Sequence, residues 1–263
     1  MDNTEKLPIL RVTQAEKKDT LDVVVKESPL TIFFNDNELV TLLCSPAELN
    51  YLAVGFLASE GLLKSKEEIK RLVVDGHRGV VRLETDKGSE SAGELVFKRF
   101  ISSGCGRGTS FYSAADVQGQ VPVSSQLVVS AEEVFTLMKE FQHCSLVFRA
   151  TGGVHSAALC DKKDILVFSE DIGRHNAIDK ILGRCLLEDI ATDDGIIITS
   201  GRISSEILLK VAKRNIPIII SKSAPTNLGV KLAADLGITL IGFVRGKRMN
   251  VYSHGGRVTT DGN

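Results

Sequence analysis

The feature that most constrains the fold is an alternation of short apolar runs with amphipathic helical patterns in the second half of the chain. Strand-like runs occupy residues 145–149, 157–159, 165–169, 196–199, 216–221 and 238–243. Helical patterns lie between several of them, at residues 177–187, 203–213 and 228–236. Alternation of this kind is typical of an α/β layered domain with a largely parallel sheet.

The first part of the chain follows a different pattern, in which β-prone runs surround one strong helix. We expect strands at residues 22–26, 30–34, 38–44, 72–74, 80–84 and 94–101. Ser45-Pro46-Ala47-Glu48 predicts a capping box at the start of the helix, and Gly61 ends it. A second capping box, from Ser130 to Glu133, opens another helix. Residues 121–125 are predicted to be a short linker, so we expect a β-rich region of residues 1–125 and an α/β domain of residues 126–263.

Charge and composition exclude several classes of partner. The 263 residues carry a net charge of -1, and aromatic residues make up 5% with no Trp, so neither nucleic acid nor an anionic membrane is an expected partner. The polar first 18 residues lack the apolar core of a signal peptide, and no apolar run approaches the roughly 18–20 residues of a membrane helix. We therefore expect a cytoplasmic protein, whose thiols stay reduced.

Polar residues collect in four loops that follow predicted strands, at residues 170–176, 200–205, 221–227 and 244–248. Each loop holds small residues, hydroxyls and at least one cation. Free N–H groups at helix starts suit phosphate, glycine lets a ligand approach the backbone, and arginine adds bidentate contacts. Because ligands of open α/β sheets bind beyond the carboxyl ends of the strands, the set predicts one site for a phosphorylated, nucleotide-like ligand. Any single loop by itself is better explained as ordinary helix-start chemistry, and only the set of four favours a ligand site. No Walker A motif is present.

The candidate ligand-binding residues come from these loops. They are Gly173, Arg174, His175, Ser200, Gly201, Arg202, Ser221, Lys222, Ser223, Val244, Arg245, Gly246, Lys247 and Arg248. His155, in Thr151-Gly152-Gly153-Val154-His155, is a further candidate that shuttles a proton or contacts the ligand. A hydrogen-bonded structural role for His155 is the open alternative.

Cys105 is the strongest candidate for covalent chemistry. The chain has five cysteines and no C-x-x-C pair, so neither a disulfide framework nor a cysteine-rich zinc site is predicted. Cys105 lies in Ser102-Ser103-Gly104-Cys105-Gly106-Arg107-Gly108-Thr109, whose glycines and hydroxyls favour an exposed loop. Arg107 favours the reactive thiolate. The other four cysteines adjoin predicted strands or an apolar helix face and fit the role of small buried hydrophobes.

Several of these segments together resemble the FdhD family, the formate dehydrogenase accessory sulfurtransferases. The resemblance lies in Ser103-Gly104-Cys105-Gly106, Thr151-Gly152-Gly153-Val154-His155, Glu170-Asp171-Ile172-Gly173-Arg174-His175-Asn176 and Thr199-Ser200-Gly201-Arg202. Gly55-Phe56-Leu57 with Glu60-Gly61, and Gly242-Phe243 through Tyr252-Ser253-His254, extend it. The segments occur in matching order over nearly the whole chain beyond about residue 20.

The resemblance implies a sulfurtransferase that receives sulfur from a cysteine desulfurase as a persulfide on Cys105. It implies transfer of that sulfur to a molybdenum cofactor carrying guanine dinucleotides, which then enters formate dehydrogenase. The segment from Phe243 to Arg248 matches the family's cofactor segment, so the resemblance implies that residues 126–263 form the cofactor-binding domain. GDP or GMP is expected to bind as a mimic of the molybdenum cofactor. The implied fold is a three-layer, cytidine-deaminase-like α/β domain with a mixed sheet, plus a smaller β-rich N-terminal region, in a homodimer.

One departure from the family leaves alternatives open. Many members carry a second cysteine three positions after the first, and here that position is Gly108, so a relay between two thiols in this loop is excluded. A protein that binds and delivers the cofactor without covalent chemistry is therefore the alternative. A nucleoside deaminase would need an H-x-E with P-C-x-x-C pattern, and His155-Ser156-Ala157 lacks the Glu.

Overall fold

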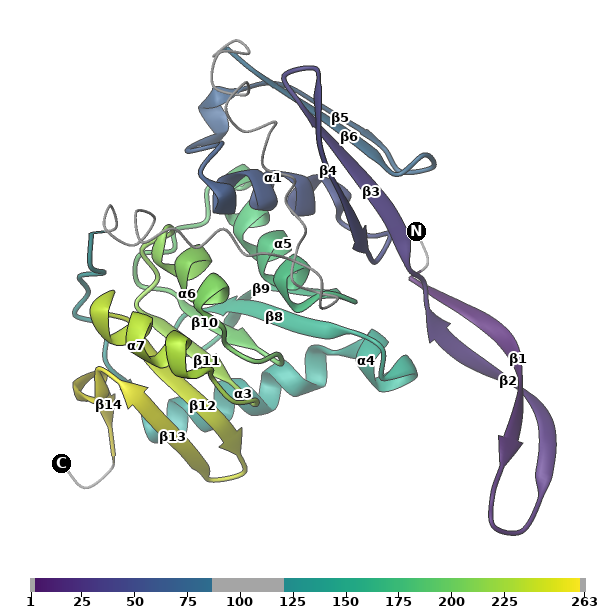
Figure 1. The fold of residues 1–263 in the computed structure, drawn as a ribbon. Helices are drawn as coiled ribbons and strands as arrows, with labels where there is room; N and C mark the ends of the chain where they lie inside the picture. Colours follow the sequence, from purple (N-terminus) through teal and green to yellow (C-terminus); the bar gives the residue numbers. More distant parts are fainter. Residues whose placement is uncertain (1–2, 87–120, 261–263) are drawn as a thin grey trace.

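The structure is a computed structural model that describes residues 3–86 and 121–260, so Cys105 and its loop lie outside the described residues. In the described chain the strands form one six-stranded sheet, one four-stranded sheet and two two-stranded sheets (Figure 1). The chain is therefore a mixed α/β protein with several sheets. No helix among residues 3–86 and 121–260 is both long enough and apolar enough to cross a membrane.

The six-stranded sheet forms the centre of the second half of the chain. Its strands, in spatial order, are β13 (Arg248–Ser253), β12 (Thr239–Arg245), β11 (Ile218–Ser221), β10 (Ile196–Thr199), β8 (His155–Cys160) and β9 (Ile165–Asp171). β10, β11 and β12 are parallel, whereas β8 pairs antiparallel with β9 and β10, and β13 pairs antiparallel with β12. The sheet is mixed rather than largely parallel because short turns join β8 to β9 and β12 to β13, and short turns allow only antiparallel pairing.

Helices cover both faces of this sheet. The side chains of α3 (Ala131–Cys144) pack with Ile196, Ile198 and Ile220 on one face. α5 (Arg174–Leu187), α6 (Ser205–Ala212) and α7 (Asn227–Asp235) pack with Ile197 and Ile219 on the other. Because side chains alternate along a strand, all-apolar runs such as that of β10 are needed to fill two cores at once.

The capping box predicted at the start of α3 is confirmed. The Ser130 hydroxyl accepts a hydrogen bond from the Glu133 backbone N–H, and the Glu133 carboxylate accepts one from the Ser130 N–H. Gly61 also ends its helix as predicted, with a left-handed φ of 81° that glycine adopts without steric cost. Both predictions rest on contacts within a few residues along the chain.

Residues 3–86 contain a four-stranded sheet, the α-helix α1 and a projecting ribbon. The sheet has the order β4 (Asn37–Cys44), β3 (Ser28–Phe34), β6 (Val80–Thr85) and β5 (Ile69–Asp75), and α1 (Leu49–Glu60) packs between it and α5. Among the described strands, β1 (Thr4–Val12) and β2 (Lys17–Val25) pair only with each other, and they extend away from the body (Figure 1). The smaller elements are η1 (Lys66–Glu68), β7 (Val129–Ser130), η4 (Gly255–Arg257) and β14 (Val258–Thr259). The domain boundary near residue 125 stays a prediction.

The capping box predicted at Ser45 is wrong. Helix α1 begins at Leu49 after Glu48, which has a left-handed φ of 57° and makes no side-chain cap. The Ser45 hydroxyl instead accepts from the Ile172 N–H at 3.2 Å, and the Glu48 carboxylate accepts from the Ser169 hydroxyl. These residues link two halves of the chain, and satisfying buried polar groups there outweighs a local cap.

The strand predicted at residues 145–149 is also wrong, because this segment is helix α4 (Leu146–Thr151). The Glu170 carboxylate accepts hydrogen bonds from the Val147 and Phe148 N–H groups at 3.1 and 3.2 Å, and so satisfies the first turn of the helix. A short apolar run does not distinguish a strand from a helix, and here a distant residue decides. The ribbon of β1 and β2 was predicted only in its last residues, since its charged sequence lacks a strong strand signal.

Candidate functional site

The predicted ligand loops meet at one edge of the six-stranded sheet. β9, β10, β11 and β12 all point toward this edge and β8 starts from it, as their pairing directions require. It carries residues 172–175 after β9, residues 200–202 after β10, residues 221–223 after β11 and His155 at the start of β8. We call these segments the rim. The structure thus brings residues of three of the four predicted loops together with His155, and the fourth loop, residues 244–248, follows β12 at the same edge.

Ser200 joins the loop after β10 to the start of β8. Its hydroxyl accepts a hydrogen bond from the Ser156 N–H at 3.0 Å and lies 3.4 Å from His155 Nδ1. The Thr199 hydroxyl accepts from the Gly201 N–H at 3.2 Å and so fixes the turn. The predicted hydroxyl residues of this loop therefore bind neighbouring backbone and one candidate histidine.

The loop after β11 continues the rim toward β12. The Ser221 hydroxyl donates to the Gly201 carbonyl at 2.7 Å and accepts from the Ser223 N–H at 2.9 Å. The Ser223 carbonyl accepts from the Phe243 N–H at 3.1 Å, and Phe243 has a positive φ of 54°. Neighbouring loops are thus connected by hydrogen bonds, which gives the rim a fixed shape.

Two arginines place positive charge on the rim. A Cβ added to Gly201 would lie 2.9 Å from Arg174 Cβ, so the aliphatic part of Arg174 lies directly against this glycine. Burial, and then the charge of Arg202, lower the pKa of Arg174. Its Nε atom is buried and has no hydrogen-bond partner in the described structure. Together the two guanidinium groups give the rim the charge that an anionic ligand would need.

Both candidate histidines on the rim are held neutral. His175 is buried in the first turn of α5, with Nε2 3.5 Å from Glu206 Oε2. Burial, followed by the charges of Lys210 and Arg174, lowers its pKa to about 3. Burial and Arg174 also lower the pKa of His155. These imidazoles can donate or accept hydrogen bonds without adding charge to the site.

A pH dependence of stability follows from His175. Its pKa is about 3 in the folded chain and 6.5 in the reference state, so the unfolded chain takes up the proton first as the pH falls. The contribution of neutral His175 to the free energy of unfolding is therefore present above pH 6.5 and is lost as the pH falls below that value. Relative to His175→Gln, we expect wild type to lose about 2 kcal/mol of unfolding free energy between pH 6.5 and 5. Urea denaturation across this range measures it. His143→Gln, at an exposed histidine, should run parallel to wild type, and a pH-independent difference for His175→Gln would contradict the assignment.

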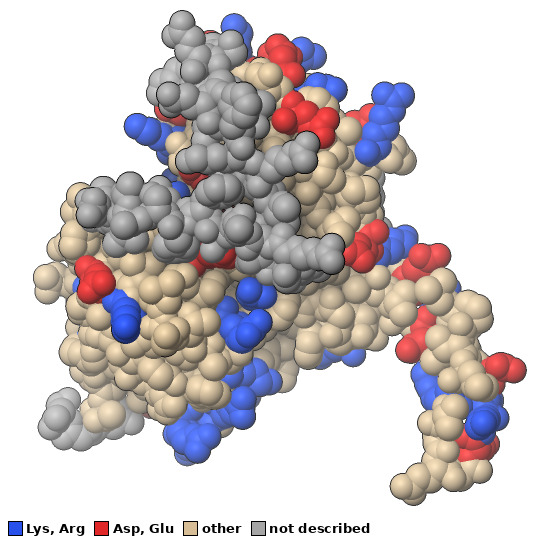
Figure 2. Space-filling model, in the orientation of Figure 1, with Lys and Arg blue, Asp and Glu red and all other residues tan. Residues whose placement is uncertain are grey.

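A cavity of about 780 Å³ lies beside the rim, between α3 and the turn that joins β12 to β13. Its lining includes Phe135, Lys139, Arg149, Gly246 and Lys247. Lys and Arg side chains also gather at this turn on the molecular surface (Figure 2). The predicted ligand segment from residue 243 to 248 therefore lies next to a hollow with cationic and aromatic walls.

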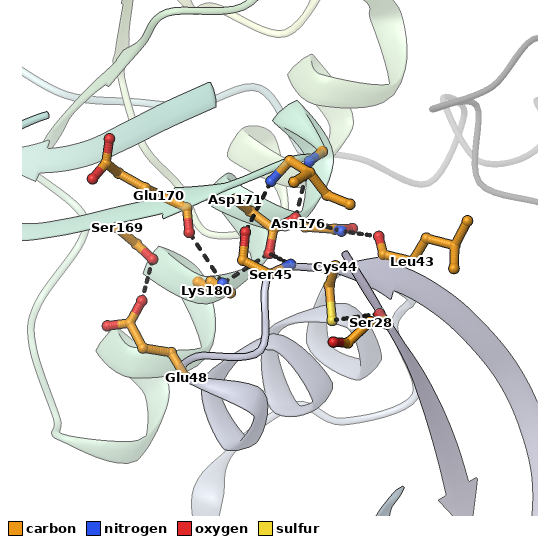
Figure 3. A network of polar contacts seen from close by, with 12 residues as sticks. Ser28, Leu43, Cys44, Ser45, Glu48, Ser169, Glu170, Asp171, Asn176 and Lys180 are labelled. Atoms are coloured by element: carbon orange, nitrogen blue, oxygen red, sulfur yellow. Dashed lines mark hydrogen bonds and ion pairs between the residues drawn. The ribbon is translucent and has the colours of Figure 1, made fainter. Parts of the chain in front are cut away.

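Below the rim lies a buried network around Asp171 that sequence reasoning missed (Figure 3). The Asp171 carboxylate is fully buried and accepts from the Ser45 N–H at 3.1 Å, the Gly173 N–H at 2.9 Å and Asn176 Nδ2 at 2.9 Å. Lys180 Nζ lies 2.7 Å from it and is equally buried. The network fixes the loop that carries Arg174 and His175 against the strand end before α1.

A second buried ion pair joins three helices. Lys210 on α6 donates to both carboxylate oxygens of Asp179 on α5, at 2.7 and 2.6 Å, and the Ser59 hydroxyl of α1 donates to the same carboxylate at 2.7 Å. The available sequence signal was the presence of Asp179 and Lys180 inside an otherwise apolar helical pattern. Charged residues are almost never fully buried unless they are paired.

The cysteines of the described chain do not have the properties of nucleophiles. Cys44, Cys160 and Cys185 are buried as predicted, and burial raises the pKa of their thiols to about 12, 12 and 11. Cys144 differs from the prediction because it is exposed, and partial burial still raises the pKa of its thiol. Cys105, the predicted nucleophile, lies outside the described residues.

Comparison with known proteins identifies the family of this chain. The sequence model of the FdhD/NarQ family matches residues 25–259. The chain is 47% identical to the sulfur carrier protein FdhD of Bacillus pumilus, over 90% of this chain and 91% of the relative. It is 45% identical to that of Bacillus subtilis, over 95% of each chain. A crystal structure of a formate dehydrogenase accessory protein from Desulfotalea psychrophila superposes with a TM-score of 0.81 at 27% identity, covering 98% of this chain and 100% of that one. The chain belongs to the FdhD/NarQ family.

Proposed function

We propose that this protein is a sulfur carrier for formate dehydrogenase, acting as a sulfurtransferase through a persulfide on Cys105. The observation that carries the proposal is the rim, where two arginines and two neutral histidines surround the ends of the central strands. Relatives at 45 and 47% identity that bear the name sulfur carrier protein support it. The raised thiol pKa values of the four described cysteines leave Cys105, beside Arg107, as the residue suited to nucleophilic attack.

The sulfur transfer proceeds by thiolate exchange. The Cys105 thiolate attacks the outer sulfur of a persulfide on a cysteine desulfurase, so a new S–S bond forms and the donor cysteine leaves as its thiolate. No external oxidant is required, because the transferred sulfur keeps its oxidation state. Delivery to the metal as sulfide breaks the Cys105 S–S bond and needs two electrons, which a thiol reductant supplies.

The sulfur acceptor in this proposal is the molybdenum cofactor that carries guanine dinucleotides. Arg174 and Arg202 offer positive charge to its phosphates, and the segment from Phe243 to Arg248 borders the cavity of about 780 Å³, which would receive the base. GDP or GMP serves as a simple mimic. The proposal includes the three-layer, cytidine-deaminase-like character of the domain from residue 126, a homodimer, and action in the cytoplasm.

The test is an intact-mass measurement after incubation with a cysteine desulfurase and cysteine. Wild type is expected to gain one sulfur, which a reductant removes. Cys105→Ala is expected to gain none, whereas Cys144→Ser, which removes the exposed described thiol, should label like wild type. Equal labelling of Cys105→Ala and wild type, or no labelling of wild type, would overturn the proposal.

A second function is favoured by Gly108, which stands where a second thiol would assist the first. In this alternative the protein binds and delivers the cofactor without covalent chemistry. Formate dehydrogenase activity in cells lacking the protein distinguishes the two. Full activity with Cys105→Ala supports delivery alone, whereas loss of activity supports the persulfide.

A further inference from the structure

His155 is the first residue of β8 and lies on the rim between the ends of β9 and β10. It stands opposite Asp171 of β9 in the register of the central sheet, and it is half-buried. Burial, and then the charge of Arg174, lower the pKa of its imidazole. The ring is therefore neutral near pH 7, with a proton on one nitrogen and a lone pair on the other. The nitrogen that carries the proton decides what the ring offers to a ligand.

The hydroxyl of Ser200 is held in place by its neighbours. Its oxygen accepts from the Ser156 N–H at 3.0 Å, and the Ser200 N–H donates to the Ser156 carbonyl at 3.0 Å, so two hydrogen bonds join these residues. A hydroxyl has one proton to donate besides the lone pairs with which it accepts. Among residues 3–86 and 121–260, the other hydrogen-bonding atom in reach of this hydroxyl is His155 Nδ1, at 3.4 Å.

The contact between Ser200 and His155 has two possible directions, and one of them satisfies every group. If Nδ1 carried the proton, the Ser200 oxygen would accept from two N–H groups, and its own proton would have no acceptor within the described residues. If Nδ1 is the acceptor, the hydroxyl donates to it and still accepts from the Ser156 N–H. Because polar groups of folded chains are paired where a partner is in reach, the second direction is favoured. The imidazole proton is then on Nε2.

The Nε2–H group of His155 is left for a ligand. Nδ1 and Nε2 point in different directions from the ring, so Nε2 is turned away from Ser200 when Nδ1 faces it. Nε2 itself makes no hydrogen bond within the part of the chain that the structure describes. The carboxylate of Asp171 is already occupied by the three N–H donors and the lysine of its buried network (Figure 3).

Two arginines lie near this imidazole. The charges of Arg174 and Arg202 both act on the His155 ring, and the side chain of Arg174 packs on Gly201, next to Ser200. A positively charged imidazole would be repelled by the two guanidinium groups, whereas a neutral one adds a donor without adding charge. The lone pair of the opposite tautomer would repel a phosphate oxygen. The position of one proton thus decides whether His155 attracts or repels an anion at the rim.

We infer that Ser200 is a positioning residue that fixes His155 as the Nε2–H tautomer, and that this N–H donates to a phosphate oxygen of a ligand held by Arg174 and Arg202. The ligand is the phosphorylated cofactor, so this part of the inference rests on the proposed function, whereas the tautomer does not depend on it. Ser200 orients the ring, and His155 contacts the ligand. Hydrogen bonds to charged acceptors are among the stronger ones in proteins, so loss of this contact is expected to lower affinity.

Nitrogen-15 NMR of the histidine rings tests the tautomer in the full chain. Near neutral pH, Nδ1 of His155 is expected to resonate as an unprotonated nitrogen and Nε2 as a protonated one, with the signals assigned by their loss in His155→Gln. Ser200→Ala should move both shifts toward the average of the two tautomers. Ser223→Ala, which removes another hydroxyl of the rim, should leave them unchanged. A proton on Nδ1 in wild type, or shifts that Ser200→Ala leaves unchanged, overturns the inference, and the wild-type spectrum decides alone if Ser200→Ala does not fold.

Calorimetric titration with GDP and with pyrophosphate tests the contact with the ligand. The amide nitrogen of glutamine can take the place of Nε2, whereas asparagine is shorter and reaches only the place of Nδ1. His155→Asn is therefore expected to weaken the Kd for both probes by about 10-fold or more, while His155→Gln stays within about 3-fold of wild type. His77→Gln, the same change at an exposed histidine between β5 and β6, should bind like wild type.

Each result supports or overturns the inference. Equal affinities of His155→Asn and His155→Gln, or a wild type that binds neither probe, overturn the donor role of His155. Circular dichroism establishes that the variants are folded. Persulfide labelling is read separately by mass on the wild type, so unlabelled protein with the expected tautomer and affinities overturns the sulfur chemistry alone. Labelled protein with equal affinities of the two variants overturns this inference alone.

Discussion

Replacing Asp171 with alanine is expected to lower the free energy of unfolding by about 3–5 kcal/mol. The carboxylate is fully buried and is the partner of Lys180 Nζ at 2.7 Å. Its removal leaves a buried positive charge whose remaining acceptor within residues 3–86 and 121–260 is the Glu170 carbonyl. It also leaves the Ser45 and Gly173 N–H groups without their acceptor. Urea denaturation followed by circular dichroism measures the loss.

Two further variants separate the buried charge from a general effect of the substitution. Asp86→Ala removes an exposed carboxylate 3.8 Å from Lys70, and should cost about 0–1 kcal/mol. Lys180→Met in the Asp171→Ala background removes the uncompensated charge and should recover part of the stability. Recovery stays partial because the backbone donors remain unsatisfied. A loss below about 1 kcal/mol for Asp171→Ala would show that this network does not hold the rim.

Replacing Gly55 with alanine is expected to cost about 3 kcal/mol or more, or to prevent folding. α1 and α5 pack so closely that a Cβ at Gly55 would lie 1.7 Å from the Asp179 carbonyl oxygen. The contact is reciprocal, since a Cβ at Gly183 would lie 2.0 Å from the Tyr51 carbonyl oxygen. Both obstacles are backbone, so the helices must separate. The gain of up to about 1 kcal/mol in helix propensity is too small to compensate.

The yield of folded protein and its unfolding midpoint measure this effect. Gly256→Ala is the matched control, because nothing lies within 4 Å of its added Cβ and its φ is not in the left-handed region. It should change stability by no more than about 0.5 kcal/mol. A Gly55→Ala variant as stable as Gly256→Ala would contradict the close crossing of α1 and α5.

The predictions that succeeded depend on neighbours in the chain. The Ser130 capping box and the end of α1 at Gly61 involve residues at most a few positions apart. The strands of the central sheet were predicted because buried strands need continuous apolar runs. Their carboxyl ends placed the four loops at one edge, so the rim was predictable before its contacts were known.

The predictions that failed depend on residues far along the chain. Ser45 bonds to residues 126 and 127 positions away rather than capping its own helix. Residues 146–151 form a helix because Glu170 holds its first turn. Among the described strands, β1 and β2 pair only with each other, and their sequences carry no strong strand signal.

By itself the sequence determined the family, the order of most elements and the loops that form the rim, since these follow from local motifs and from apolar periodicity. Only the tertiary structure decided that Asp171 and Lys180 are buried together, that His175 is neutral, and that the ribbon of β1 and β2 extends away from the body. The physical reason is that burial is a property of assembled surfaces. The charge state and the exposure of a side chain follow from its burial. That burial arises only when segments far apart in the sequence pack against each other.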